Sequence, residues 1–371
     1  MAAPGFWKRM LGRKAEPGSP GDSAGGPSTL PSTQPQHFQT ESGASLDSYE
    51  IGPELGRGAM AVVHLATERA SGRQVAIKRL ALQREFAAED LIDVRQRFMR
   101  EARAAGHLAH PDILQVLDAG PTGHDAWIAM EYVQGQDLSH FTRAGALLPV
   151  REVLALAIRL ARALAFAHSQ GVVHRDIKPS NVMLDRSHGT LKIMDFGIAR
   201  IADGSRTRTG LVLGTPSFMS PEQLAGLKVD GRSDLYSLGA MVYQLLTGHL
   251  PHQSDSMAKL MYQIANEPPA DVRHHRPELP ESLALVLALA LEKRPELRYA
   301  SGAQMAQDLE AVIAQWPASL ARGPAQAPAD KSADAAHVTP PEHADPFAQT
   351  VRLNKAEAVQ NPPASQPDTQ P

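Results

Sequence analysis

The feature that most constrains this chain is the run His-Arg-Asp-Ile-Lys-Pro-Ser-Asn at residues 174–181. It places the carboxylate of Asp176 beside Lys178 and the amide of Asn181, and a second carboxylate follows in Asp195-Phe-Gly. A carboxylate can accept a hydroxyl proton, a lysine can neutralise negative charge, and carboxylate and amide oxygens suit Mg²⁺. The run therefore contains the groups that the transfer of a phosphoryl group requires.

Composition divides the 371 residues into three parts. Residues 1–46 are rich in Pro, Gly, Ser and Thr, and residues 318–371 are mostly polar or small, with almost no periodic hydrophobicity. Neither tail can bury enough apolar surface to offset the entropy lost on ordering, so we expect both to be disordered. Residues 49–316 alternate apolar periodic segments with Gly and Pro, and we expect them to form one domain with a large core.

Charge and cysteine content exclude some classes of function. The net charge is −3, so there is no basic field that would favour nucleic acid as a partner. The chain has no cysteine, which excludes a disulfide framework and a thiolate metal site. This composition fits a reducing compartment, and a cytoplasmic location is the expectation.

The apolar segments predict no transmembrane segment. The most apolar stretch, residues 282–291, is about half the ~20 residues that a membrane helix needs, so we interpret it as a buried core helix. The basic start at residues 6–14 carries aromatic side chains but lacks the long apolar region of a signal peptide. We interpret it as disordered; contact with an acidic membrane surface or a partner protein is the alternative.

Residues 49–316 predict an α+β, bilobal fold, in which a small antiparallel β-sheet lobe with one helix precedes a larger helical lobe. Short β-rich runs bounded by turn residues predict strands at 49–51, 62–65, 75–78, 114–117 and 127–130. A helix is expected from about residue 85 to residue 108, before Pro111, with one apolar face formed by Leu91, Val94, Phe98, Ala102 and Ala105. Further helices are expected at 153–169, 233–247, 258–265, 283–292 and 303–316.

A glycine-bearing turn between the first two strands is a candidate phosphate-binding loop. Glycine has no side chain, so the backbone at Gly56 and Gly58 can approach a phosphate closely. The pattern expects a third glycine where Ala61 stands, which is a mild departure, and an ordinary hairpin turn is the alternative. The candidate nucleotide-binding residues here are Leu55, Gly56, Arg57, Gly58, Ala59, Met60, Ala61, Val62 and Val63, the last against an adenine base.

Lys78 ends an apolar strand and needs an anionic partner if it faces inward, because an unpaired buried ammonium is strongly disfavoured. Glu101, on the helix that follows, is the candidate partner. Two surface charges on separate elements are the alternative for either residue considered alone.

Taken in order, these motifs resemble those of eukaryotic-like bacterial serine/threonine protein kinases. The order is glycine-bearing loop, strand lysine, helix glutamate, His-Arg-Asp, Asp-Phe-Gly and the Ser-Pro-Glu at residues 220–222. The resemblance covers about residues 49–316 and neither tail. It implies the protein-kinase fold, with ATP as phosphoryl donor, Mg²⁺ as cofactor and proteins as substrates.

The resemblance also implies a role for each residue of the central run. Asp176 is expected to orient the attacking hydroxyl and accept its proton, and Lys178 to neutralise the transferring phosphoryl group. Asn181 and Asp195 are expected to bind magnesium. Lys178-Pro and Thr215 resemble kinases that act on serine or threonine, so aliphatic hydroxyl groups are the expected acceptors.

Other positions match the hinge and the structural supports of that family. The backbone of Glu131 and Val133 is expected to pair with the adenine edge. Glu222 is expected to anchor the end of the activation segment through Arg298, and Asp234 to brace the backbone of the catalytic loop.

The family pattern also suggests regulation by phosphorylation. Arg175 precedes the catalytic aspartate, an arrangement that implies pairing with a phosphorylated loop, and our hypothesis is autophosphorylation in trans at Thr207 and Thr209, through a transient homodimer. Unmodified loop threonines are the alternative. The apolar island at residues 347–353 suggests a docking site for a phosphothreonine-reading partner.

Two other classes compete with an active protein kinase. A pseudokinase scaffold usually lacks one of Lys78, Asp176 and Asp195, and all three are present. A small-molecule kinase would not need the Ser-Pro-Glu anchor or a full activation segment.

Overall fold

The computed structural model describes residues 45–58, 61–196 and 216–315. Most of the two predicted tails, Ala59 and Met60 of the candidate loop, and residues 197–215 with Thr207, Thr209 and Thr215 lie outside the described residues. In the described part of the chain, no helix is long and apolar enough to cross a membrane.

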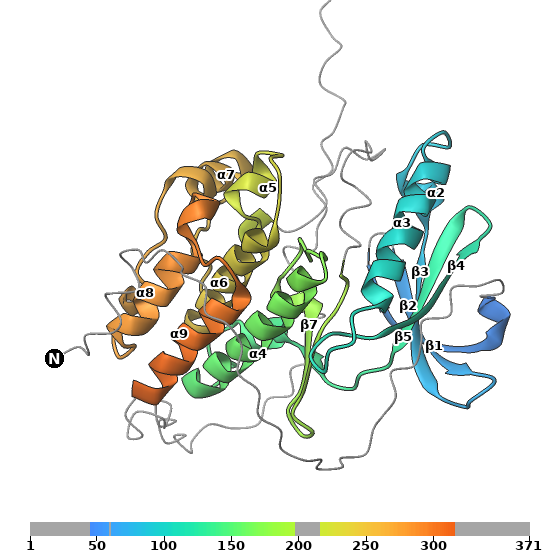
Figure 1. Ribbon diagram of the computed structural model, residues 1–371, viewed down its shortest axis with the longest axis horizontal. Coiled ribbons are helices and arrows are strands. Elements are labelled where there is room, and N and C mark those ends of the chain that lie inside the picture. The colour runs from blue at the N-terminus through green and yellow to red at the C-terminus, as the bar shows by residue number, and fades with distance from the viewer. Residues whose placement is uncertain (1–44, 59–60, 197–215, 316–371) are drawn as a thin grey trace, which may run out of the picture. The chain divides into compact units, whose positions relative to one another are not determined.

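The first half forms the predicted antiparallel sheet. Its five strands lie in the order β1-β2-β3-β5-β4, and every neighbouring pair is antiparallel (Figure 1). The strands are β1 (Tyr49–Arg57), β2 (Ala61–Glu68), β3 (Gln74–Leu80), β4 (Val116–Thr122) and β5 (Asp125–Glu131).

The turn predicted at residues 55–58 is wrong in its position. Strand β1 continues through Gly56, which pairs with Val63, to Arg57, which pairs with Val62. The turn comes later, where the amide of Gly58 donates to the carbonyl of Ala61 at 2.8 Å. Neither Gly56 nor Gly58 has a positive φ, so the backbone here stays compatible with pairing to β2.

One long helix, α3 (Leu91–Gly106), packs against β4 and β5. The five residues of its predicted apolar face are all buried, which confirms the helical period of the pattern: Leu91, Val94, Phe98, Ala102 and Ala105. The predicted start near residue 85 is wrong, because a separate short helix, α2 (Leu82–Glu85), ends there. Phe86 is extended and buried, so its ring reaches the core outside the helical path.

The second half is mainly helical and contains the larger core. Helix α4 (Val150–Ser169) packs against α6 (Gly231–Thr247) and α9 (Gly302–Gln315), and α8 (Glu281–Ala290) packs against α6 and α9 (Figure 1). The remaining helices are α5 (Pro221–Leu224) and α7 (Met257–Asn266). The five helices predicted for this half are confirmed, with ends that differ by three residues at most.

Close helix packing requires glycine at the start of α9. A side chain at Gly302 would collide with the backbone carbonyl of Ala161, so α9 can begin against α4 only with glycine at this position. In the same half, Gly171 has φ +75 just after α4, as expected for a glycine that ends a helix.

A small three-stranded sheet has one strand before α4 and two strands directly after the central run of residues. Its strands are β6 (Gln136–Asp137), β7 (Val182–Asp185) and β8 (Thr190–Ile193). Strand β8 also joins the segment before β4: the amide of Leu114 donates to Ile193, and the amide of Ile193 donates to Asp112, both at 2.9 Å. The end of β8 is thereby fixed against the first half of the domain.

Candidate active site

The loop that carries residues 174–181 is held by the carboxylate of Asp234. Asp234, fully buried in the first turn of α6, accepts the amide of His174 at 2.8 Å and the amide of Arg175 at 2.7 Å. Arg175 has φ +69, a conformation that costs free energy for a residue other than glycine. Two charge-assisted hydrogen bonds hold the backbone in this conformation, and the predicted brace is confirmed.

His174 connects this loop to the segment that contains Asp195. Its Nδ1 accepts the amide of Asp176 at 3.2 Å, and its Nε2 lies 2.6 Å from the carbonyl of Met194. These contacts require a neutral ring with the proton on Nε2. The ring also packs edge-to-face on Phe196, with centroids 4.6 Å apart. Sequence reasoning gave neither aromatic residue a role, although both stand inside the quoted motifs.

The structure brings Asp176, Lys178 and Asn181 together. Lys178 Nζ lies 2.8 Å from Asp176 Oδ2, and Asn181 Nδ2 donates to the same oxygen at 2.9 Å and to the Asp176 carbonyl at 2.7 Å. Since the amide nitrogen of Asn181 is used in these contacts, Oδ1 is the atom that it would offer a cation. Asn181 is buried and the Lys178 and Asp176 side chains are only partly exposed, which strengthens their electrostatic interactions.

Asp195 lies beside Lys78, and this contact corrects the predicted partner of the lysine. Lys78 Nζ donates to Asp195 Oδ1 at 2.7 Å, so its partner in this structure is Asp195 and not the predicted Glu101. An ammonium whose side chain is 13% exposed pairs with the carboxylate that the fold brings nearest, and the position of β8 brings Asp195. Although burial alone raises the pKa of Asp195, the Lys78 ammonium more than offsets it and the pKa lies below its ordinary value.

The backbone of the glycine-bearing segment is open. A side chain atom built at Gly56 would meet nothing within 4 Å, and one at Gly58 would meet only the Ala61 carbonyl, at 3.8 Å. Neither glycine has positive φ. Folding therefore does not require glycine at either position, whereas close approach of a phosphate would, and the segment fits a nucleotide.

Glu131, at the end of β5, is held by partners that the sequence-based predictions missed. Its Oε1 accepts Lys192 Nζ at 2.6 Å and the amide of Gln115 at 2.7 Å. Lys192 comes from β8, so this contact connects the predicted hinge to the helical half. The Lys192 and Glu131 side chains are 13% and 19% exposed, which makes the pair well shielded from water. The contact could not be predicted from the sequence, because no motif around Lys192 points to Glu131.

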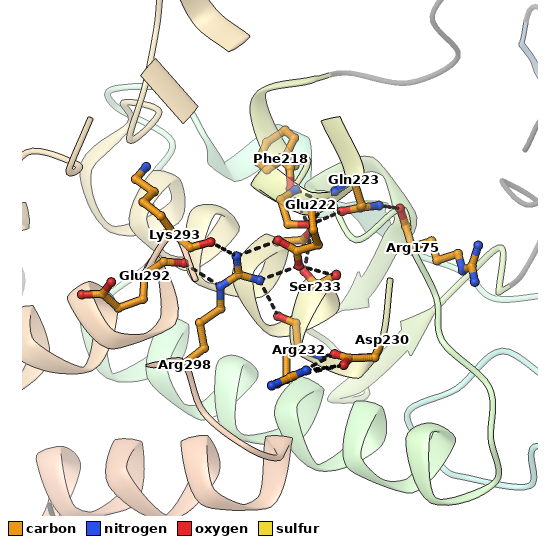
Figure 2. A network of polar contacts seen from close by, with 12 residues as sticks. Arg175, Phe218, Glu222, Gln223, Asp230, Arg232, Ser233, Glu292, Lys293 and Arg298 are labelled. Atoms are coloured by element: carbon orange, nitrogen blue, oxygen red, sulfur yellow. Dashed lines mark hydrogen bonds and ion pairs between the residues drawn. The ribbon is translucent and has the colours of Figure 1, made fainter. Parts of the chain in front are cut away.

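The predicted pair of Glu222 and Arg298 is confirmed and belongs to a larger network (Figure 2). Arg298 donates to the two carboxylate oxygens at 2.6 and 2.8 Å, and Ser233 Oγ donates to Oε1 at 2.5 Å. The remaining Arg298 donors reach the carbonyls of Glu292 and Lys293. Burial raises the pKa of Glu222, but the hydrogen bonds from Arg298 and Ser233 outweigh it, so the pKa is lowered.

Gln223 connects this network to the loop that carries the central run of residues. Its Nε2 donates to the carbonyl of Arg175 at 2.7 Å, while its Oε1 accepts the amide of Ser220 at 3.0 Å (Figure 2). The second contact is half of a capping box that begins α5. The Ser-Pro-Glu-Gln sequence is a capping signal that could have been used to predict it.

Comparison with known proteins assigns the chain to a family. The sequence profile of the protein kinase domain matches residues 49–309. A probable serine/threonine-protein kinase of Streptomyces coelicolor is 42% identical over 272 residues, which are 71% of this chain and 40% of that protein. This chain belongs to the protein kinase family, and it spans less than half the length of that relative.

Solved structures agree with this assignment. The kinase domain of Mycobacterium tuberculosis PknI is 34% identical, with a TM-score of 0.59, and the match covers 74% of this chain and 100% of that one. A structure of Rad53 residues 1–466 in complex with AMP-PNP is 25% identical, also with a TM-score of 0.59, over 70% of this chain and 64% of that one. The bilobal protein-kinase fold predicted from the sequence is confirmed.

Replacing Glu222 with glutamine should destabilise the protein and flatten its response to acid. The folded-state pKa lies below the ordinary value of 4.5, so the carboxylate stabilises the fold above that pH, and this contribution is lost as the pH falls through the folded pKa. We expect Glu222→Gln to lower the free energy of unfolding by about 3–5 kcal/mol at pH 7 and by less at pH 3, as measured by urea denaturation.

Glu310→Gln is the matched control for that measurement. It makes the same chemical change in a surface pair with Arg162, where the expected cost is about 1 kcal/mol or less. Equal losses for the two variants at pH 7 would contradict the role given to the buried pair.

The Lys192–Glu131 pair should show energetic coupling in a double-mutant cycle. Lys192→Met leaves the Glu131 carboxylate without its cation, and Glu131→Gln removes that charge, so the double variant should recover part of the loss. We expect a coupling free energy of about 1–3 kcal/mol from urea denaturation. Arg186 and Glu152, a more exposed pair, should couple by about 1 kcal/mol or less; a similar value for both pairs would argue against a hinge support.

Proposed function

We propose that this chain is an ATP-dependent protein kinase that transfers the γ-phosphoryl group of Mg-ATP to serine and threonine hydroxyls of proteins. The observation that carries the proposal is the convergence of Lys178 and Asn181 on Asp176, each within 3 Å of its carboxylate, on a loop fixed by Asp234. Family membership and the likeness to Rad53, whose structure contains AMP-PNP, support the choice of nucleotide.

The transfer has a defined balance of bonds and protons. A bond forms between the acceptor hydroxyl oxygen and the γ-phosphorus, the bond from that phosphorus to the bridging oxygen breaks, and ADP leaves. Asp176 orients the hydroxyl and accepts its proton, while Lys178, already beside Asp176, neutralises charge on the transferring group. Positioning and charge neutralisation account for most of the catalysis in this reaction.

The donors for magnesium are oxygens of Asp195 and Asn181, and both suit a hard cation. When bound, magnesium neutralises the phosphate oxygens. Asp195 remains ionised because Lys78 lowers its pKa, so its carboxylate is available as a ligand at neutral pH. Lys78 and magnesium would therefore compete for the same carboxylate, that of Asp195. Lys78 can then turn to the phosphates.

The nucleotide base is expected to contact the hinge. We propose that backbone groups of Glu131 and Val133 pair with the adenine edge, and that Val63 covers the ring. The Lys192 contact holds the Glu131 side chain, which leaves the backbone of the segment as the group to recognise the base. Gly56 and Gly58 would lie over the phosphates.

Asp176→Asn should abolish most of the transfer. It keeps the size of the side chain but removes the base, and the expected loss in kcat is about 10²–10⁴-fold. The measurement is transfer of labelled phosphate from Mg-ATP to a generic protein substrate, followed by phosphoamino-acid analysis. Asp255→Asn, the same change at an exposed position, should retain activity. Labelling of aminoglycosides but not protein would favour a small-molecule kinase, and absence of all labelling would favour a pseudokinase.

Phosphorylation of the loop that contains Thr207 and Thr209 would regulate the enzyme. The backbone contacts of Arg175 with Gln223 and Asp234, which fix this residue next to Asp176, support the proposal. Purified protein should carry phosphate on one or both threonines by mass spectrometry, and the Asp176→Asn variant should carry neither. Mixing the variant with active protein should restore the modification if it occurs in trans; identical loop phosphates on both proteins expressed alone would contradict autophosphorylation.

A further inference from the structure

The outer side of α3 and the neighbouring β4 form a groove that the proposed catalysis does not use. Its volume is about 440 Å³. The lining residues are Arg95, Gln96, Met99, Arg100, Arg103 and Pro121.

The groove is cationic although the chain as a whole has a net charge of −3. Three of its six lining residues are arginines, and none is a carboxylate. Arg95 donates to the carbonyl of Gly123 at 2.8 Å. In the part of the chain whose side chains are described, none of the three guanidinium groups forms an ion pair. Such a cluster favours an anionic ligand, because carboxylates accept two hydrogen bonds from arginine.

The same face is also apolar. Met99 is half-buried in the groove, Pro121 is exposed, and Ile92, one turn before Gln96 on the helix, is 60% exposed. Residues four apart lie on the same side of a helix, so Ile92 extends the groove toward the start of α3. A ligand that matches this surface carries acidic groups next to a large apolar side chain.

A segment of the C-terminal tail has that composition. Residues 342–351 contain Glu342, Asp345 and Phe347 and no lysine or arginine, and Phe347 is the only aromatic residue after Trp316. The N-terminal segment at residues 6–14 is basic instead, so the arginines would repel it. We propose that residues 342–351 dock in the groove of the same molecule, with Phe347 against Met99 and Pro121 and the two carboxylates on the arginines.

The connection is long enough for this contact. Helix α9 ends at Gln315, and residues 316–341 supply 26 residues before Glu342. A flexible chain of that length has an end-to-end distance of about 28 Å and reaches about 85 Å when extended. A folded domain of the size of residues 45–315 has a radius of gyration of about 18 Å. The tethered segment is present at roughly millimolar effective concentration, so a weak contact suffices.

Because the chain has no cysteine, introduced cysteines can test the contact directly. The full-length double variant Gln96→Cys, Ala348→Cys pairs the groove with the tail, and Glu281→Cys, Ala348→Cys pairs the tail with an exposed position on α8. The measurement is the rate of intramolecular disulfide formation under a mild oxidant at low protein concentration. We expect the groove pair to react at least about tenfold faster than the control pair.

Charge substitutions can distinguish specific docking of the tail in the groove from random collision of the two cysteines. Adding Arg100→Glu and Arg103→Glu should lower the groove-pair rate to the control rate, and adding Glu342→Lys and Asp345→Lys to that protein should restore it. Thermal denaturation should confirm that these variants remain folded. Equal rates for the two cysteine pairs, insensitivity to the charge changes, or disulfides formed only between molecules would each overturn the proposal. None of these readouts requires kinase activity.

Discussion

The organisation of the site depends on the buried carboxylate of Asp234. A charge taken out of water is stable only if hydrogen bonds replace its hydration, and Asp234 obtains them from the amides of His174 and Arg175 and from His168 Nε2 at 2.8 Å. The buried carboxylate is therefore stable only when the loop keeps this position. These hydrogen bonds offset the free-energy cost of the positive φ at Arg175. Asp176 is the next residue in the chain, so its position is set by the contact between this loop and Asp234 of α6.

Contacts from this loop spread in two directions. Through His174 it holds the carbonyl of Met194, next to Asp195, and through the Arg175 carbonyl it holds Gln223. Gln223 belongs to the turn that the Glu222–Arg298 pair fixes in the core. Asp176, Asp195 and the segment around Gln223 are thus connected by hydrogen bonds to backbone groups, and such groups have less freedom to move than long side chains.

Two ion pairs between side chains also connect the two halves of the domain. Lys78 contacts Asp195, and Lys192 contacts Glu131, so each half provides one cation and one carboxylate across the junction. The Glu131 contact lies at the predicted hinge and needs no ligand to form. The Asp195 contact uses groups that magnesium and phosphates would compete for, so we propose that it is exchanged when nucleotide binds.

Residue order alone was enough to predict the family, the antiparallel sheet followed by helices, the apolar face of α3, the Asp234 brace and the Glu222–Arg298 pair, because these follow from local periodicity or from motifs. The start of α3, the extent of β1 and the partner of Lys78 could not be predicted in this way. They depend on how Phe86 is buried, on ladder pairing with β2, and on which carboxylate the packing of β8 brings nearest. Contacts such as Lys192–Glu131 join residues 61 positions apart, and only the folded chain sets that distance.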